Sequence, residues 1–453
     1  MRTGQWMFKT GALLAFGALL MLGGCVTQEP VKKAGKKEEL AYPAPPDPPR
    51  FFYERTLRSS GDVELGEKES SMDISALMTG QEGAGGGKGF GKPFGIAAHK
   101  GKVFVGDTLR RSVMVFEPGK GKFTEYGKSD PGALAKPLGM RTDAKGNLYV
   151  VDSTNKRVMA YDPDGKFIRS YGQKEDFEHP SGVAVTPDGS RIYVVDTGRS
   201  QGKPEFHRVR VYDGASGSHL FDIGRRGAEN GQLNLARDAV IGPDGLLYVV
   251  DGGNFRIQVF NQDGKFVRGF GTVGRRLGQF ARPKGISMDN EGNLYVSDAS
   301  HGNFQIFNPK GQLLMFIGGR GKDDAPEYYT LPAMLTLDED GRIYIVDQAL
   351  KKVDIFRPAT IKEDEGALGV GFQKLKSGDI PKDTKKPASK EEEKPAKPAA
   401  PVAEQDDDEE EGPPIPDEAA PPAAKQESKA APKAEAKPAA KPAAKPADSK
   451  KKR

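Results

Sequence analysis

The chain has 453 residues, with 68 Lys and Arg against 63 Asp and Glu, a formal net charge of +5 and a single cysteine. One thiol cannot make an internal disulfide, a cysteine-rich zinc site, an iron–sulfur cluster or a covalent haem attachment, because each needs more than one. So small a net charge gives no reason to expect a nucleic-acid partner. All 23 Phe, 13 Tyr and the one Trp precede residue 373, so a region of ordinary globular composition is followed by a polar tail.

The first 24 residues have the features of an export signal. A basic start precedes the apolar run at 11–22, which is too short to span a bilayer as a mature helix. The run ends in Leu22-Gly-Gly-Cys25, which resembles the lipobox of a bacterial lipoprotein. The resemblance implies that residues 1–24 are removed and that Cys25 is lipidated; the alternative is a signal peptide with a chance cysteine. Val26, rather than Asp, favours sorting to the outer membrane.

Residues 25–50 are rich in Pro and Lys and contain no apolar period. Prolines favour an extended conformation, so we interpret this segment as a tether that holds the next domain away from the membrane. The expected location is the bacterial cell envelope, with the membrane contacted through the lipid anchor. Whether the domain lies on the periplasmic or the surface side stays open.

The middle of the chain repeats six times. Each unit has a short apolar strand, a polar turn and a second strand that ends in Asp, and third and fourth strands follow with Asp-Gly turns between strands. The units open at Pro93-Phe-Gly95, Pro137-Leu-Gly139, Pro180-Ser-Gly182, Arg237-Asp-Ala239, Pro283-Lys-Gly285 and Pro332-Ala-Met334. The second strands end at Asp107, Asp152, Asp196, Asp251, Asp298 and Asp347.

Four antiparallel strands in each of six units predict an all-β fold, a six-bladed β-propeller over residues 51–360. The Pro-x-Gly openings, the Leu-Tyr-Val-x-Asp centres and the Asn-x-Arg motifs at 155–157 and 254–256 resemble the NHL repeat family over residues 90–357. In this alignment the fourth unit lacks the opening Pro-x-Gly. Propellers of this kind serve as scaffolds, sensors and enzymes, so the resemblance does not choose a function.

The sixth unit has no clear fourth strand after residue 356. Residues 51–58, near the start of the chain, resemble the fourth strands of the other units. We therefore predict that this N-terminal strand completes the sixth blade and closes the ring, which removes exposed strand edges.

The sequence predicts no catalytic residues, no metal and no cofactor. The strand-end aspartates share one repeat position, which indicates that they accept backbone N–H groups. The five histidines occupy different blade positions and lack metal-ligand spacing. One NHL-type enzyme, the peptidyl-hydroxyglycine amidating lyase, holds zinc in its channel through three histidines. A metal-dependent lyase or hydrolase with a central-channel site is therefore the alternative, with His179 nearest an inner strand.

Charge differs between the two faces of the predicted propeller. The loops between second and third strands share a face with the connectors between blades, and that face is the more basic one. Its candidate partner-binding residues are Arg111, Lys156, Arg157, Arg199, Lys203, Arg225, Arg226, Arg275, Arg276, Lys284 and Arg320. Arg282, Lys322, Lys351 and Lys352 lie on the same loops. Loops commonly carry binding functions, although such charge can also serve solubility alone.

Residues 361–453 are rich in Lys, Ala, Pro and Glu, and we predict that they form a disordered tail. An acidic block at 404–418 precedes a basic block at 425–453. The basic end suits an anionic envelope polymer such as cell-wall glycan or lipopolysaccharide. A solvated spacer explains the composition equally well.

Together these features predict a membrane-anchored, extracytoplasmic NHL propeller that acts as a non-catalytic protein-interaction scaffold. The expected partner is an envelope protein that docks on the basic loop face, an exported cytochrome being one candidate. Two alternatives stay open: a propeller enzyme with a metal in its channel, and an envelope tether that works through the basic tail.

Overall fold

The computed structural model describes residues 39–64, 86–321 and 324–380. The export signal, Cys25 and the tail beyond residue 380 lie outside this part of the chain. No helix within the described ranges is both long and apolar enough to cross a membrane.

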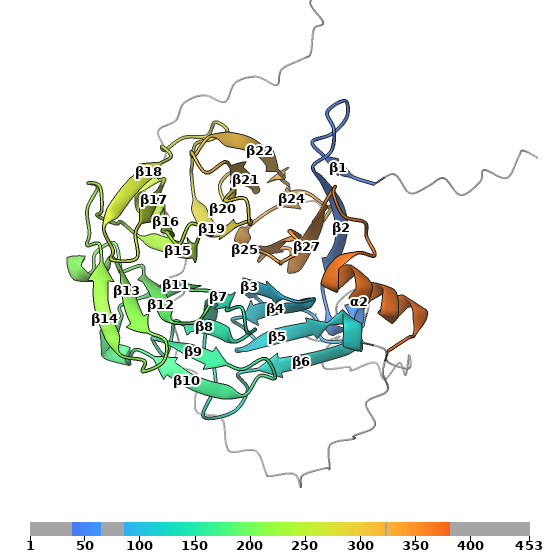
Figure 1. Cartoon of the computed structure of the whole chain (residues 1–453), viewed down its shortest axis with the longest axis horizontal. Coiled ribbons are helices and arrows are strands. Elements are labelled where there is room, and N and C mark those ends of the chain that lie inside the picture. Colours follow the sequence, from blue (N-terminus) through green and yellow to red (C-terminus); the bar gives the residue numbers. More distant parts are fainter. Residues whose placement is uncertain (1–38, 65–85, 322–323, 381–453) are drawn as a thin grey trace, which may run out of the picture. The chain divides into compact units, whose positions relative to one another are not determined.

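The described residues form a ring of six antiparallel sheets around a central axis (Figure 1). Blade 1 has β3 (Pro93–His99), β4 (Lys102–Asp107), β5 (Ser112–Glu117) and β6 (Lys122–Tyr126). Blade 2 has β7 (Pro137–Thr142), β8 (Leu148–Asp152), β9 (Arg157–Tyr161) and β10 (Phe167–Tyr171). Blade 3 has β11 (Pro180–Val185), β12 (Arg191–Asp196), β13 (Arg208–Asp213) and β14 (His219–Ile223). Blade 4 has β15 (Ala236–Ile241), β16 (Leu247–Asp251), β17 (Arg256–Phe260) and β18 (Phe266–Phe270), and blade 5 has β19 (Pro283–Met288), β20 (Leu294–Asp298), β21 (Asn303–Phe307) and β22 (Leu313–Ile317).

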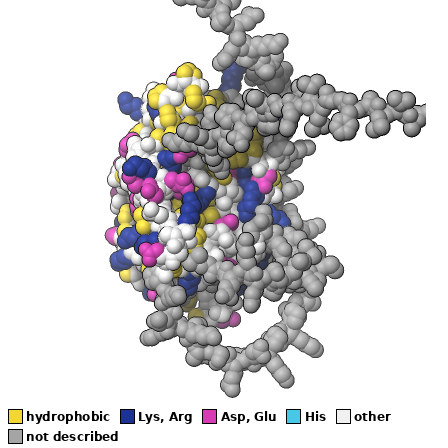
Figure 2. Space-filling model, turned by 90° about the vertical axis from the view of Figure 1, so that its right-hand side faces the viewer, with side chains coloured by type: hydrophobic (Ala, Val, Ile, Leu, Met, Phe, Trp, Pro, Cys, Tyr) yellow, Lys and Arg dark blue, Asp and Glu magenta, His cyan; other side chains and the backbone are white. Residues whose placement is uncertain are grey.

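The first strand of each blade lies innermost, next to the first strands of its two neighbours. Second strands such as Leu148–Asp152 are buried along their whole length, because neighbouring blades cover both sides of the sheet. That burial explains their continuous apolar sequences. Fourth strands such as Phe167–Tyr171 alternate between more and less exposed side chains, since they form the rim. Seen edge-on, the rim carries basic, acidic and hydrophobic side chains side by side (Figure 2).

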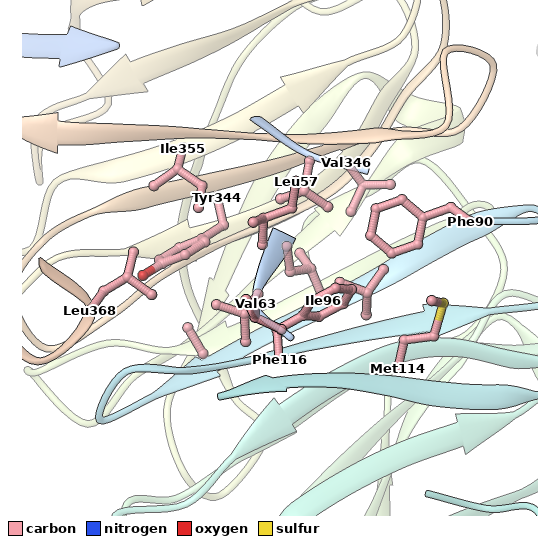
Figure 3. Close-up of a cluster of buried hydrophobic side chains, with 14 of the residues drawn as sticks. Leu57, Val63, Phe90, Ile96, Met114, Phe116, Tyr344, Val346, Ile355 and Leu368 are labelled. Carbon is pink, nitrogen blue, oxygen red and sulfur yellow. The ribbon is translucent and has the colours of Figure 1, made fainter. Parts of the chain in front are cut away.

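Blade 6 is assembled from both ends of the described chain, which confirms the predicted closure. Its strands from the axis outward are β25 (Pro332–Leu337), β26 (Ile343–Asp347), β27 (Lys352–Pro358), β2 (Phe51–Leu57) and β1 (Ala41–Tyr42). β2 pairs antiparallel with β27 from Phe51 opposite Pro358 to Leu57 opposite Val353. Leu57 then joins Phe90, Phe116, Tyr344 and other buried side chains in a cluster that joins blades 1 and 6 (Figure 3).

Regular structure extends beyond both predicted boundaries of the propeller, residues 51 and 360. The tether was expected to extend to residue 50, but Ala41 and Tyr42 pair with β2 as a fifth strand. Tyr42 is buried there because its ring packs edge-on against Phe356, with the centroids 5.5 Å apart.

The disordered tail was expected from residue 361, but Gly366–Ser377 forms the helix α2, which lies beside blades 1 and 6 (Figure 1). Its buried Leu368 and Phe372, four residues apart, face the core cluster. The Arg55 guanidinium lies over the Phe372 ring at 3.6 Å. These contacts order the segment, since its apolar side chains are removed from water.

Short elements complete the described chain. β23 (Gly319–Arg320) and β24 (Tyr328–Tyr329) pair in parallel between blades 5 and 6. The short 3-10 turns are η1 (Ser60–Asp62), η2 (Pro118–Lys120), η3 (Lys174–Asp176), η4 (Pro204–Phe206) and η5 (Gly252–Asn254).

Blade 4 corrects the sequence alignment by one residue. Ala236 lies opposite Asp251, just as Pro137 lies opposite Asp152 in blade 2. The blade 4 equivalent of Pro-x-Gly is therefore Ala236-Arg237-Asp238, not the triplet that begins at Arg237. Because neither the proline nor the glycine is kept here, the sequence alone gave no fixed point for this register.

Candidate functional site

The strand-end aspartates organise one face of the propeller. The Asp107 carboxylate accepts hydrogen bonds from the backbone N–H groups of Gly91 (2.6 Å) and Lys92 (3.0 Å) in the connector that enters blade 1. It also accepts from the N–H groups of Leu109 and Arg110 in the loop after β4. Connectors and second-to-third-strand loops are thus fixed to each other. We call the surface that they form the connector face, and the opposite surface, with its Asp-Gly turns, the hairpin face.

The other blades repeat this arrangement, which accounts for the shared repeat position of the aspartates. Each strand-end carboxylate is buried and accepts at least one N–H from the connector of its own blade: Asp152 from Ala135 and Lys136, Asp196 from Glu178 and His179, Asp251 from Asn234, Asp298 from Ala281 and Arg282, and Asp347 from Thr330 and Leu331. Burial raises the pKa of Asp196 to about 6. The expected structural role of these aspartates is borne out by their hydrogen bonds.

The glycines of the Pro-x-Gly motifs are required by the closeness of neighbouring inner strands. A Cβ atom on Gly95 would lie 1.9 Å from the carbonyl oxygen of Leu138, and one on Gly182 would lie 2.7 Å from that of Arg237. Only glycine fits such spacing without a backbone shift. In blades 1 to 5 the residue before this third position instead lies at the channel mouth.

A pocket of about 450 Å³ opens at the channel mouth on the connector face. Fifteen residues from all six blades line it, and none of them is acidic. The cationic lining residues are Lys92, Arg237, Arg282, Lys284 and Lys351. The apolar lining residues are Phe94, Leu109, Leu138, Leu331, Met334 and Ala349. His179, Ser181, Gln348 and Gly91 complete the wall.

Two blades depart from glycine at the third motif position, and both departures fill the channel. Met334 of blade 6 lines the pocket, while Asp238 of blade 4 is fully buried. The Asp238 carboxylate pairs with the Arg141 guanidinium of blade 2 at 2.8 Å. The same guanidinium donates to the carbonyl of Ile286 in blade 5 at 2.5 Å. Arg141 therefore joins three inner strands across the channel axis.

The comparisons with known proteins agree with this architecture. The NHL repeat family matches residues 233–260. The protein is an NHL-repeat β-propeller. A stretch of 65 residues, 14% of the chain, is 42% identical to the RING finger protein nhl-1 of Caenorhabditis elegans and spans 7% of that relative.

Solved structures resemble the fold at low sequence identity. A protein of unknown function from Bacteroides thetaiotaomicron is 14% identical with a TM-score of 0.50, over 67% of this chain and 75% of that one. A streptogramin B lyase is 15% identical with a TM-score of 0.45, over 59% of this chain and 93% of that one. Likenesses of this size concern the propeller fold alone.

The predicted partner-binding cations of this NHL propeller all lie on connector-face loops or at the start of the strands that leave them. Eight are exposed: Arg111, Arg199, Lys203, Arg225, Arg226, Arg275, Arg276 and Arg320. Lys156, Arg157 and Lys284 are half-buried, and Lys284 alone of the eleven lines the channel pocket. Lys352, expected on the same face, is instead buried with its Nζ 2.8 Å from the Asp354 carboxylate.

Sequence reasoning missed Lys92 and Arg237 in the pocket. Arg237 occupies the middle position of the blade 4 motif, and the residues at that position in blades 1, 2, 3 and 5 also line the pocket. Lys92 directly precedes the motif proline of blade 1. Reading these two positions across all six units would have identified nine of the fifteen lining residues.

The histidines do not converge. His179 lines the pocket, whereas His207 is buried between the N–H of Leu235 and the carbonyl of Arg199, each 3.1 Å from a ring nitrogen. Burial lowers the pKa of His207. Within the described ranges, no three His, Cys, Asp or Glu side chains are grouped so that they could hold a metal ion.

Exposed apolar side chains accompany the arginines of the connector face. Leu109 is 61% exposed, Leu277 50%, Val273 44% and Tyr328 41%. Arg275 and Arg276 lie between Val273 and Leu277 in one connector. The side chains of Arg225, Arg226, Arg275 and Arg276 make no hydrogen bond or ion pair with the described residues. This surface thus offers charge and apolar area that the propeller's own described contacts do not use.

Proposed function

We propose that this NHL propeller is a membrane-anchored, extracytoplasmic, non-catalytic interaction module whose connector face docks an acidic envelope protein. The observation that carries the proposal is the pairing of exposed arginines with exposed apolar side chains on the same connector loops. Arginine and large apolar residues are the types that dominate binding energy at protein interfaces.

The arrangement of charge favours a protein partner with an acidic contact surface. Arg225 and Arg226 lie on the connector into blade 4, and Arg275 and Arg276 on the connector into blade 5. Adjacent blades therefore present two cationic pairs to one partner. Complementary charge would speed association and set orientation, while Leu277 and Val273 would supply buried area.

Charge reversal on the two faces tests the proposal. A connector-face variant carries Arg225→Glu, Arg226→Glu, Arg275→Glu and Arg276→Glu. A matched hairpin-face variant carries Lys145→Glu, Lys166→Glu, Lys265→Glu and Lys310→Glu, four exposed lysines in turns. We expect a stoichiometric partner to co-purify from native membranes with the wild type and the hairpin-face variant, and to be lost from the connector-face variant.

The same partner at the same yield from both variants would overturn the proposal. Melting temperatures of the two variants provide the control, because both change only exposed side chains and should fold alike.

The anchor is a separate part of the proposal. It rests on Cys25, which the lipobox resemblance places at the mature N-terminus. Several acyl chains bind membranes firmly, whereas an unlipidated tether has little affinity. We expect Cys25→Ser to move the protein from the membrane fraction to the soluble envelope fraction, or to leave it unprocessed with its signal. An unchanged, processed membrane-bound product would contradict the anchor.

A further inference from the structure

We infer that the channel mouth is a separate binding site for a small organic anion with an apolar body, a ligand that combines a phosphate or carboxylate with a ring or short chain. The inference goes beyond the docking of a protein on the connector loops. It rests on the charge, shape and rigidity of the pocket.

The positive charge of the pocket favours an anionic ligand. Five Lys and Arg residues line about 450 Å³, and none of the fifteen lining residues is acidic. Cations gathered in a concave site create a positive potential that concentrates anionic ligands. Arg237 and Lys284 occupy the channel-facing positions of adjacent blades 4 and 5, so their head groups can contact one anionic group together.

The backbone that carries these cations is fixed before any ligand binds. The N–H of Lys92 donates to Asp107 and that of Arg282 donates to Asp298, both at 3.0 Å. The Ser181 hydroxyl donates to the Arg237 carbonyl at 2.8 Å. A site held in this way loses little backbone freedom on binding, which favours affinity.

The apolar wall distinguishes an amphipathic anion from an inorganic one. Phe94, Leu138 and Met334 come from blades 1, 2 and 6, on the side of the channel away from Arg237 and Lys284. All six apolar lining residues thus come from blades 1, 2 and 6, where Lys92 and Lys351 also lie, while the other three cations come from blades 4 and 5. Its volume lies in the range of small-molecule sites, several times that of one phosphate ion.

The channel does not continue as an open tube below the pocket. The Arg141–Asp238 pair joins blades 2, 4 and 5 further along the inner strands, and Arg141 is only 8% exposed. The mouth is therefore a blind site that suits a compact ligand. An extended chain threaded along the axis would have to break this buried pair.

The test uses three probes on the full chain: 2-naphthyl phosphate, neutral 2-naphthol and inorganic phosphate. Isothermal titration at moderate salt is expected to give one site for naphthyl phosphate, at least tenfold tighter than for either half of the molecule. The double variant Arg237→Gln with Lys284→Gln should bind naphthyl phosphate at least tenfold more weakly than the wild type. Lys145→Gln with Lys265→Gln on the hairpin face should leave the affinity unchanged.

A second pair of variants separates the two sides of the pocket. Phe94→Ala should lower the affinity for naphthyl phosphate and leave the weak affinity for inorganic phosphate unchanged. Lys92→Gln removes one cation without a core change, and it keeps the test valid if the double variant fails to fold. The inference is overturned if naphthyl phosphate binds no tighter than phosphate, or if the pocket and hairpin-face variants bind it alike.

Discussion

The charged side chains of the two faces of the propeller differ in what they do for the fold. On the hairpin face, acidic side chains shape the turns: Asp143 accepts the N–H groups of Lys145 and Asn147, and Asp289 accepts those of Glu291 and Asn293. On the connector face, the exposed arginines have no such task among the described residues. The hairpin-face acids are needed to hold the turns, whereas the exposed arginines hold none of the described structure. The connector face is therefore the better candidate for contact with a partner.

The pockets of the two faces repeat the contrast. A hairpin-face pocket, also about 450 Å³, is lined by Asp289, Glu291, Glu339 and Asp340 together with Arg50. Asp289 there is a turn acceptor, and the Glu339 carboxylate pairs with His99 at 2.7 Å. The channel pocket has five cations at three repeat positions and no acid. The two pockets have the same volume, so volume does not distinguish them. They differ in that acids of the hairpin-face pocket have structural partners, whereas the channel pocket is lined by cations without any acid.

Removing the closing strand should have the largest effect, because both faces depend on an intact ring. Deletion of residues 51–58 removes β2 and exposes the edge of β27. We expect the melting temperature to fall by at least roughly 10 °C. Deletion of residues 39–44, which removes only the short β1, is the control and should have a smaller effect. An unchanged melt after loss of β2 would refute the closure.

The buried pair between the faces gives the next largest effect. Arg141→Met leaves the Asp238 carboxylate buried without its cation and should destabilise the protein by about 3–5 kcal/mol in urea unfolding. The double variant with Asp238→Gly restores the glycine of the other blades and should lose less than Arg141→Met alone. Additive losses would mean that the two side chains do not interact across the channel.

The faces should also differ in how strongly each needs its aspartates. Asp107→Ala removes the acceptor of four backbone N–H groups in a buried place and should destabilise by about 2–4 kcal/mol. Asp162→Ala removes the acceptor for Asp164 and Lys166 in an exposed turn, where water replaces it, and should destabilise by under about 1 kcal/mol. Equal losses would remove the distinction between the faces.

The smallest effect is a difference in titration within blade 3. Burial raises the pKa of Asp196 to about 6, whereas the N–H of Ser190 lowers the pKa of Asp188 to about 2. The Asp196 contribution to stability should therefore grow as pH falls from about 6 to about 4, and that of Asp188 should be lost as pH falls from about 4 to about 2. Carboxyl NMR titration measures both; similar midpoints would contradict the assignment.

Much of the fold could be predicted because the same motif occurs six times. The strand-end aspartates each accept backbone N–H groups, and the motif glycines each allow close packing of inner strands. Because these residues recur at fixed positions, the sequence indicates that their role is structural. The helix α2 was missed because its core-facing residues, Leu368, Phe372 and Leu375, span only two turns in a segment otherwise rich in Gly and Lys. The pocket was missed because its lining comes from six blades that lie far apart in sequence and are brought together only by the ring.

Site-specific photo-crosslinking shows whether the connector face is the surface that contacts the partner. A benzophenone amino acid replaces Arg226 or Leu277 on the connector face, and Lys145 or Lys265 on the hairpin face, in the full-length protein in native membranes. We expect one discrete adduct from the connector-face positions and none from the hairpin-face positions. An adduct confined to the hairpin face, or adducts of equal yield from both faces, would contradict this expectation.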